Sequence, residues 1–462
     1  MFGSWHKLTG AVCAVFLIFG SISLLGGRLL PNPLFTSDST GVLGTYSTAG
    51  GIDINNAFFQ SLGTNGRSCN TCHISSSAWT ITPADVRQKF DRTQGTDPIF
   101  RTNDGSNCPS ADVSTIAARL SAYGQLLNKA LIRVSVPVPP NAEFQIIGIQ
   151  DPYNCPETTS TNPALYRRPL PAANLDFLST VMWDGRETIF GDIPKRSINL
   201  VQSLTNQAND ATVGHAQGAP PTAQQLADIV AFETSLFTAQ VKNESVGDLT
   251  ARGAEGGPIQ LSKQHFYVGI NDSLGGDPHG ASFSPDVFTI YQSWANLKGS
   301  PHQNSVARGE ALFNRFPIPI TGVAGLNDAL GQEVIMGTCT TCHDTPNAGN
   351  HSYSVPLAIG TTAYPANSAI DVAGLPVYTV QCVATGVTTR VTDLGRALIT
   401  GKCADIGKVK GPVLRALAAR APYFHNGGAD TLRDIVEFYD QRFHLGLTPQ
   451  QKADLVAFLQ TL

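Results

Sequence analysis

The residues with the clearest chemistry form the pattern Cys-x-x-Cys-His, which occurs twice in the chain. The first copy comprises Cys69, Cys72 and His73, and the second comprises Cys339, Cys342 and His343. In this spacing two thiols can add to the vinyl groups of a haem, and the next histidine can bind its iron. Zinc would need two such pairs close together, but these stand 270 residues apart. A redox dithiol would not need the histidine. The sequence therefore predicts two covalently bound c-type haems.

Five of the nine cysteines lie outside these motifs. Cys13 lies in an apolar N-terminal run, Cys108 and Cys155 follow the first motif, and Cys382 and Cys403 follow the second. An even number after each motif predicts a Cys108–Cys155 and a Cys382–Cys403 disulfide, with free buried thiols as the alternative.

The N-terminus has the pattern of an export signal. Within residues 1–30, Lys7 precedes an uncharged apolar run from Ala11 to Leu25. The apolar segment is also about as long as a membrane-spanning helix requires, so a cleaved signal peptide and an uncleaved membrane anchor both stay open. Either way we expect the body of the protein in the periplasm, free or anchored to the inner membrane.

A fifteen-residue segment is repeated, at Thr222–Leu236 and at Thr448–Leu462, with nine identical positions. Both copies predict a helix with a capping box, because Gln225 and Gln451 stand three residues after the threonines. Each half of the chain thus has a haem motif near its start and the same amphipathic helix at its end, which is the layout of a cytochrome c.

The repeat divides the chain of 462 residues. We expect a mainly α fold, with two cytochrome c-like haem domains over 45–240 and 306–462, long loops and little strand. Short helices should precede the motifs, at Asn55–Gln60 and Arg308–Arg315. Residues 241–305 are too long for a plain linker, and we expect an ordered connection over the domain interface. Its three histidines are expected on the surface or in loops: His265, His279 and His302.

Methionine and net charge limit the functions that the chain can have. Lysine and arginine number 31 against 35 acidic residues, so no broad basic face is available for nucleic acid. Electron-transfer c haems usually have His/Met or His/His ligands, but the chain has only Met1, Met182 and Met336. Met336 lies three residues before Cys339 and is poorly placed to reach the far side of that haem. Two haems must therefore use histidine, tyrosine or an open site, where iron can meet peroxide or oxygen.

Further segments resemble a known family. These are Val181–Glu187 (V-M-W-D-G-R-E), Leu414–Arg415, Ala421–Gly428 (A-P-Y-F-H-N-G-G) and Thr431–Tyr439. Together with the two haem motifs they resemble the bacterial di-haem cytochrome c peroxidase and MauG superfamily. The resemblance covers roughly residues 50–240 and 306–462.

The resemblance implies roles for several residues. Trp183 matches a tryptophan between the two haems that relays electrons, Arg415 an arginine that meets haem propionates, and Pro422 a residue whose carbonyl helps to hold Ca²⁺. In the peroxidases a methionine ligand of the C-terminal haem follows the histidine of P-Y-F-H by fourteen positions. Counting from His425 gives Tyr439 here, as in MauG, where tyrosine binds the iron. An aromatic residue on a helix flank is the alternative.

The distal side of the N-terminal haem departs from the family. There the peroxidases carry a glutamate with a glutamine nearby, but here no glutamate occurs between Glu187 and Glu233. Gln207 matches the glutamine, and His215 is the strong acid–base group close by. His215 is a candidate for the distal acid–base group. Coordination of the first iron, or a structural role in a loop, are its alternatives.

The leading hypothesis is a di-haem c-type peroxidase-like oxidoreductase. Electrons would enter at the C-terminal haem from a small redox protein, either a cytochrome c or a cupredoxin, pass through Trp183, and reduce hydrogen peroxide at the N-terminal haem. The alternatives are a non-catalytic di-haem electron carrier and a MauG-like oxidase of another protein. A homodimer stays open.

Overall fold

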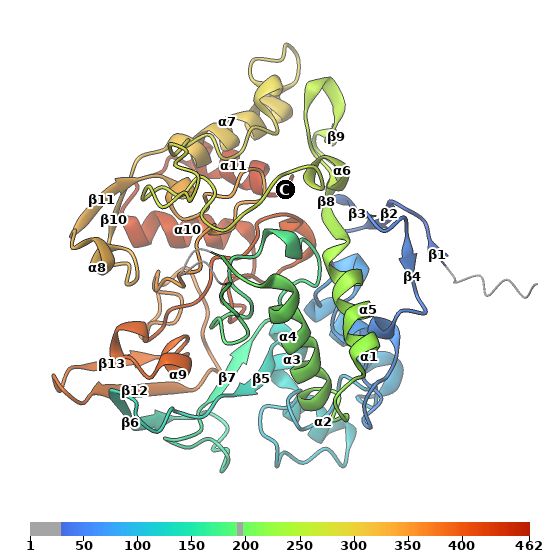
Figure 1. Cartoon of the computed structure of the whole chain (residues 1–462), viewed down its shortest axis with the longest axis vertical. Coiled ribbons are helices and arrows are strands. Elements are labelled where there is room, and N and C mark those ends of the chain that lie inside the picture. The colour runs from blue at the N-terminus through green and yellow to red at the C-terminus, as the bar shows by residue number, and fades with distance from the viewer. Residues whose placement is uncertain (1–28, 192–196) are drawn as a thin grey trace, which may run out of the picture.

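The computed structural model describes residues 29–191 and 197–462 (Figure 1). Residues 1–28, which carry most of the predicted signal or anchor, lie outside this range. The described residues form eleven α-helices, nine short 3-10 helices and thirteen strands in five sheets. The expectation of a mainly α fold with little strand is only partly correct, because strands recur throughout the described chain.

The first half of the chain contains five α-helices. They are α1 (Pro83–Thr93), α2 (Ile116–Ala122), α3 (Gly124–Lys129), α4 (Leu200–Gly214) and α5 (Ala223–Thr234). The capping box predicted for the repeated helix is present in α5, where Thr222 and Gln225 bond reciprocally to each other's backbone N–H. Ahead of the first haem motif, the short predicted helix is the 3-10 helix η1 (Ala57–Phe59).

The second half contains the remaining helices. They are α6 (Pro258–Leu261), α7 (Pro301–Arg315), α8 (Asn327–Leu330), α9 (Ala397–Thr400), α10 (Leu432–Phe443) and α11 (Pro449–Leu459). The second capping box, Thr448 with Gln451, is present at α11. Helices α7 and α11 pack closely at Gly309, where an added Cβ would lie 2.0 Å from the carbonyl oxygen of Asp454. This contact joins the helix before the second haem motif to the helix that closes the chain.

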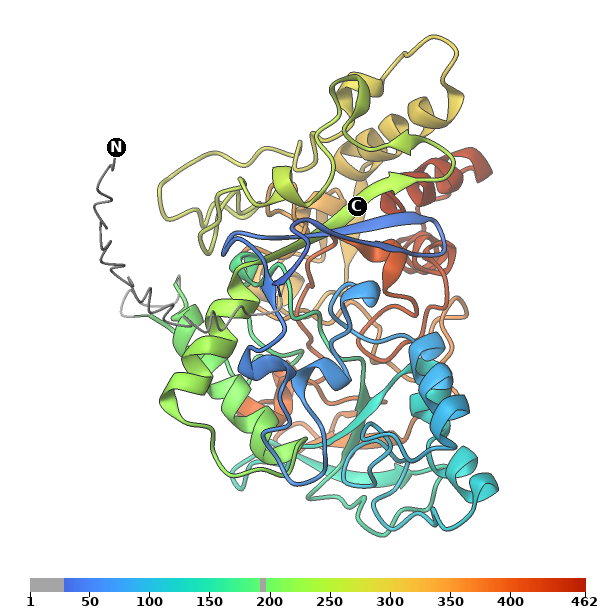
Figure 2. The ribbon, with the colours of Figure 1, turned by 90° about the vertical axis from the view of Figure 1, so that its right-hand side faces the viewer.

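All of the paired strands run antiparallel. Two sheets have three or four strands: β2 (Leu34–Ser37), β3 (Gly41–Ser47), β8 (Leu236–Asn243) and β9 (Gly247–Asp248) in one, and β13 (Thr388–Val391), β12 (Val377–Cys382) and β6 (Phe144–Gln150) in the other. The other sheets are pairs: β1 (Leu29–Leu30) with β4 (Ile52–Asp53), β5 (Ile132–Ser135) with β7 (Ala164–Arg167), and β10 (Ile318–Thr321) with β11 (Val334–Gly337). Figure 2 shows the ribbon of β2, β3 and β8 running between the yellow and red helices and the blue and green ones.

The two halves of the chain share structure. Strand β6 from the first half pairs with β12 from the second, so one sheet contains both. One hydrophobic core likewise combines Phe177 and Leu178 with Ala348 and Val413. The domain limits at 45–240 and 306–462 stay a prediction, but the cavities described below lie within a continuous body.

The connection over 241–305 contributes side chains to a hydrophobic core, and its expected place over a domain interface stays a prediction. Tyr291 and Trp294 are fully buried in the core that includes α7, α10 and α11, and α7 begins within it at Pro301. The prediction for its three histidines is confirmed, since all three are exposed: His265, His279 and His302.

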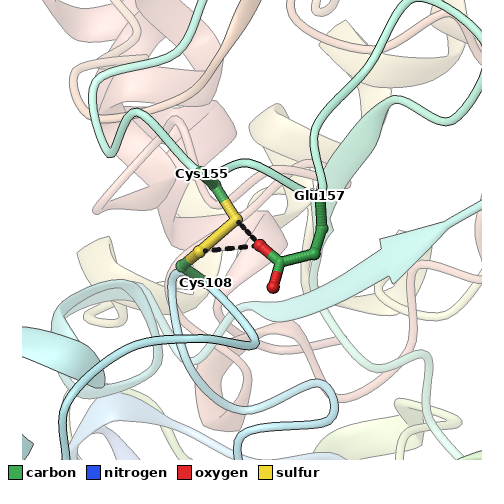
Figure 3. A group of neighbouring side chains, drawn as sticks. All are labelled: Cys108, Cys155 and Glu157. Atoms are coloured by element: carbon green, nitrogen blue, oxygen red, sulfur yellow. Dashed lines mark hydrogen bonds between the residues drawn. A yellow bond between two sulfur atoms is a disulfide. The ribbon is translucent and has the colours of Figure 1, made fainter.

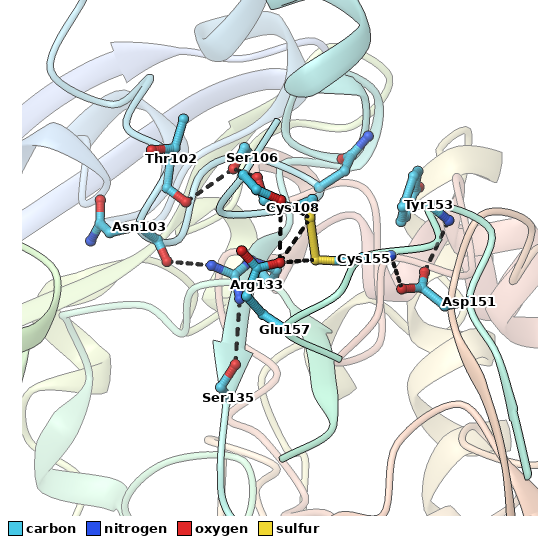
Figure 4. Close-up of a disulfide and its surroundings, with 12 residues drawn as sticks. Thr102, Asn103, Ser106, Cys108, Arg133, Ser135, Asp151, Tyr153, Cys155 and Glu157 are labelled. Atoms are coloured by element: carbon cyan, nitrogen blue, oxygen red, sulfur yellow. Dashed lines mark hydrogen bonds between the residues drawn. A yellow bond between two sulfur atoms is a disulfide. The ribbon is translucent and has the colours of Figure 1, made fainter. Parts of the chain in front are cut away.

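Both predicted disulfides are present, Cys108–Cys155 and Cys382–Cys403. The carboxylate of Glu157 lies against the first of them (Figure 3). Arg133 is packed beside the same bond and donates to backbone and hydroxyl oxygens of its neighbours (Figure 4). Among the described residues the four cysteines of the haem motifs are the free ones: Cys69, Cys72, Cys339 and Cys342.

Candidate functional site

Each Cys-x-x-Cys-His motif faces its own cavity. The first cavity has a volume of about 210 Å³ and is lined by Cys69, Cys72 and His73. The second has a volume of about 230 Å³ and is lined by Cys339, Cys342 and His343. The remaining lining of both is largely aliphatic and aromatic, which suits a flat apolar macrocycle.

A 3-10 turn positions the thiols of each motif. These turns are η2 (Cys69–Thr71) and η7 (Cys339–Thr341), and each has a capping box made by Ser68 or Thr338. Burial raises the pKa of Cys69 to about 12 and that of Cys72 to about 11. It also raises the pKa of Cys339 and of Cys342 to about 12. The free thiols are therefore neutral, as expected for side chains that enter an apolar cavity.

The two motif histidines are held in the same way. Nδ1 of His73 lies 2.9 Å from the carbonyl oxygen of Trp79, and Nδ1 of His343 lies 2.6 Å from that of Gly349. A carbonyl only accepts, so Nδ1 carries the proton and Nε2 keeps its lone pair. Burial lowers the pKa of both imidazoles, which favours the neutral form. Both therefore have the tautomer and charge of an axial iron ligand.

A wall shared by the two cavities carries three basic side chains, Arg168, Lys410 and Arg420. Burial, with the nearby charge of Arg420, lowers the pKa of Arg168 to about 9. Burial lowers the pKa of Lys410 to about 7 and that of Arg420 to about 10. Within the described chain, Nε of Arg420 has no hydrogen-bond partner. Buried cations need anionic partners, and the propionates of two haems would supply them. The residues present thus fit two c-type haems.

Trp183 also lies in this shared wall. Its Nε1 donates to the carbonyl of Arg168 at 2.8 Å, and its own carbonyl accepts from the backbone N–H of Lys410 at 2.9 Å. The ring of His425 stands 6.2 Å from it, edge to face, and lines the second cavity. The structure thus places an indole ring between the cavities, where the resemblance implies a relay.

Gln207 and His215 both line the first cavity. Gln207 lies on α4, and His215 follows the last residue of that helix. Nδ1 of His215 lies 2.5 Å from Oδ2 of Asp104, whose Oδ1 accepts from Nη1 of Arg67 at 2.5 Å. Burial opposes ionisation of Asp104, but His215 and Arg67 outweigh it and hold the pKa of this carboxyl below its ordinary value. An ionised, buried carboxylate therefore orients His215 and leaves Nε2 available.

Tyr439 on α10 lines the second cavity together with the haem motif. Burial raises the pKa of its phenol, so the free side chain is protonated. Of the methionines, Met182 lines the first cavity, whereas the side chain of Met336 is exposed. Of the two methionines in the described residues, Met182 therefore lies at the first cavity and neither lines the second, where Tyr439 is available.

Two further residues named from the resemblance are Arg415 and Pro422, and only Pro422 lines a cavity. Arg415 is buried but lines neither cavity, and it donates to the carbonyls of Leu462 and Asn347. Pro422 lines the second cavity. Among the described residues, the one cluster of potential metal-binding side chains is Cys108, Cys155 and Glu157, whose cysteines form a disulfide (Figure 3). Within residues 29–191 and 197–462 the side chains supply no carboxylate cluster for Ca²⁺, and binding of this ion stays a prediction.

Several residues of the cavities were missed in the sequence. Asp104 and Arg67 carry no motif of their own, and only the fold brings them to His215. Lys410 and Arg420 flank the segments that carry the resemblance, but only the fold brings them to a common wall. Glu233 was visible as a mismatch in the repeated helix.

The curated proteins that resemble this chain are bacterial cytochrome-c peroxidases. IdrP2 of Denitromonas iodatirespirans is 34% identical over 144 residues, covering 29% of this chain and 38% of that protein. IdrP2 of Pseudomonas sp. (strain SCT) is 28% identical over 206 residues, covering 38% and 53%. Cytochrome c551 peroxidase of Nitrosomonas europaea is 29% identical over 146 residues, covering 30% and 36%. These matches confirm the resemblance to the di-haem cytochrome c peroxidase and MauG superfamily.

The matches are partial. In these three cases this chain spans no more than about half of the relative's length. A solved MauG-like protein associated with microbial copper homeostasis aligns with 88% of this chain and 86% of its own, at 16% identity and a TM-score of 0.38. No protein-family model matches. Within residues 29–191 and 197–462, helices of the length and apolarity needed to cross a membrane are absent.

Proposed function

We propose that the chain is a di-haem c-type oxidoreductase of the peroxidase kind, which reduces hydrogen peroxide at the N-terminal haem with electrons that enter at the C-terminal haem. The observation that carries this proposal is the pair of His215 and Asp104 at the first cavity. The bound haem supplies the redox chemistry of iron. The residues of the chain orient the haem, exclude water and move protons.

His215 is the proposed acid–base group. Reduction of H₂O₂ to two molecules of water consumes two electrons and two protons. With Nδ1 held by Asp104, Nε2 of His215 would take the proton from one oxygen of H₂O₂ and deliver it to the other oxygen, which leaves as the first water. The negative charge of Asp104 stabilises the imidazolium between these two transfers. The two electrons and two protons from solvent would then convert the remaining oxygen to the second water. The side chain of His215 is 45% exposed, so it can exchange protons with solvent.

Gln207 and Trp183 complete the proposed site. Gln207 faces the same cavity from α4, where its amide can donate to a peroxide oxygen. Trp183 lies in the wall common to both cavities, and this position supports its role as the electron relay. Arg168, Lys410 and Arg420 would hold the propionates of the two haems and fix their separation.

The second cavity differs from the first in its polar groups. Tyr439 replaces the methionine of the peroxidases, and a tyrosinate ligand would lower the potential of that haem relative to His/Met ligation. This feature favours a MauG-like oxidase as the second candidate. The two disulfides support an oxidising compartment such as the periplasm, where a small redox protein would serve as donor.

A spectroscopic experiment tests this proposal. Absorption spectra of the purified di-haem protein are recorded in the oxidised and half-reduced states, and H₂O₂ is then added. We expect a high-spin haem that reacts with peroxide and drives oxidation of a reduced cytochrome c or cupredoxin. Two low-spin haems that are inert to peroxide in both states would contradict the enzyme and leave the electron carrier, with His215 and Tyr439 as capping ligands.

A further inference from the structure

Glu233 places a carboxyl group inside the first cavity that the proposed mechanism does not use. It lies on the last turn of α5 and lines the cavity together with Cys69. The residue is only 6% exposed, and in the described part of the chain its Oε2 has no hydrogen-bond partner. An unpartnered buried carboxyl is costly, so a purely structural role does not account for it.

The internal repeat provides the comparison for this position. Aligning Thr222–Leu236 with Thr448–Leu462 puts Glu233 opposite Leu459. Leu459 is also 6% exposed and lines the second cavity. The same helix position therefore faces each cavity, with a leucine at the second and an ionisable group at the first. The chain thus contains its own example of the apolar side chain that fits this place.

The surroundings of Glu233 leave its charge without compensation. Of the elements that pack against α5, α4 contributes Asp210 and is followed by His215, and η4 (Leu175–Phe177) contributes Asp176. The third, η1, has no ionisable residue. The charged residues on the other walls of the cavity are Arg67, Asp104, Arg167, Arg168, Arg186, Lys410 and Arg420. None of them is hydrogen-bonded to Glu233, and burial raises the pKa of its carboxyl to about 8.

We propose that Glu233 is a redox-linked proton site, whose carboxylate binds one proton from solvent when the haem in the first cavity gains one electron and releases it when that electron leaves. An added electron makes the cavity more negative, and charges interact strongly where water is excluded. One electron from the donor and one proton from solvent enter together, so the charge of the cavity is unchanged. This inference rests on the haem of the proposed function but not on peroxide chemistry.

The test measures the midpoint potential of each haem against pH in the intact di-haem protein, without peroxide. A tenfold change in proton activity should shift the potential of the first haem by about 59 mV, the one-electron value, around the pH at which Glu233 titrates. We expect Glu233→Leu, which copies Leu459, and Glu233→Gln to flatten this dependence at the first haem. The second haem in the same sample serves as the control.

Two results would overturn the proposal: a first haem whose potential is independent of pH in the wild-type protein, or an unchanged slope in both variants. If Glu233→Leu does not take up haem, Glu233→Gln, which keeps the shape of the side chain, decides. The reduced-minus-oxidised infrared spectrum gives a second readout. It should show the C=O band of a protonated carboxyl in the wild-type protein, and retention of that band in Glu233→Gln would contradict the assignment. A failure of peroxide turnover alone would affect the proposed function and not this inference.

Discussion

Oδ2 of Asp104 lies 2.5 Å from Nδ1 of His215, although the two residues are 111 positions apart in the sequence. Arg67 holds the other carboxylate oxygen and also donates to the carbonyl of His215. The imidazole is thereby fixed at both its ring and its backbone. This contact gives a loop histidine at the edge of the first cavity a defined tautomer and orientation, which is what an acid–base group requires.

Replacing Asp104 with asparagine should therefore impair peroxide reduction. We expect turnover with H₂O₂ to fall about 10- to 100-fold, because an amide cannot stabilise the imidazolium as a carboxylate does. His215→Ala should cost about 100-fold or more, since it removes the proton-transfer group itself. Steady-state oxidation of a reduced cytochrome c or cupredoxin measures both effects.

Asp454→Asn is the matched control. Asp454 is also a buried carboxylate paired with an arginine, Arg308. This pair joins α11 to α7, and Asp454 lines neither cavity. The Asp454→Asn variant should reduce peroxide at nearly the same rate per haem as the wild-type protein. Equal losses in the two variants would mean that Asp104 acts through stability and would remove its assigned role.

The His215–Asp104 pair shows where sequence reasoning ended. His215 could be found because few strong acid–base residues follow the W-D-G-R segment. Asp104 could not, because no motif connects residues so far apart and an isolated aspartate has no distinctive neighbours. Likewise Arg168 and Lys410 became candidates only when the fold placed both on the wall between the cavities.

The same contrast holds for the fold. The helices α5 and α11 were predictable, because capping boxes and apolar periodicity are local signals. The strands were missed, because most have two to four residues and several pair with strands that are distant in sequence. Strand β3, for example, pairs Thr45 with Thr238. The residue pattern within one segment does not identify a pairing strand that lies far away in the sequence.

The contact between Arg167 and Asp393 predicts a stability effect. Arg167 donates from Nε and Nη2 to both oxygens of Asp393, at 2.7 and 2.9 Å, and both side chains are 3% exposed. Asp393→Asn leaves a buried guanidinium with Asp184 as its remaining carboxylate partner. We expect the free energy of unfolding to fall by about 3–5 kcal/mol, measured by urea denaturation of the haem-loaded protein.

The Arg167–Asp393 pair should also make the free energy of unfolding depend on pH. Burial disfavours the ionised form of Asp393, but Arg167 outweighs it and holds the pKa of this carboxyl below its ordinary value. Its stabilisation is therefore complete above the pKa of the unfolded chain, about 3.9, and is lost as pH falls through the lower folded value. In the Asp393→Asn variant the free energy of unfolding should therefore fall less steeply as the pH is lowered. Glu437→Gln, at the more exposed pair with Lys452, should cost about 0–1 kcal/mol. A similar small cost for Asp393→Asn would contradict the prediction.

The Trp183→Phe variant tests whether Trp183 relays electrons between the two haems. Phenylalanine keeps an aromatic ring but loses the Nε1 donor to the carbonyl of Arg168. We expect both haems to stay attached with unchanged spectra, while electron transfer from the second haem to the first becomes slower. Rapid photoreduction followed by absorbance at the two haems measures this rate. Trp294→Phe is the control, since Trp294 also donates to a carbonyl but lies in the connection. An unchanged rate in Trp183→Phe would exclude the relay.

Variants of Tyr439 test how the second haem is ligated. Tyr439→Phe removes the phenol oxygen, so a ligand role predicts altered absorption and electron paramagnetic resonance of the second haem alone. Tyr439→Met should give a low-spin haem of higher potential, because methionine ligation raises the potential of a c haem. Tyr423→Phe is the control: Tyr423 lines the same cavity, but its hydroxyl donates to the carbonyl of Leu417. Spectra of Tyr439→Phe identical to the wild type would make Tyr439 a packing residue of α10. A higher potential at the second haem in Tyr439→Met would also reduce its driving force for passing electrons to the first, so peroxide turnover should fall in that variant even though the first cavity is unchanged.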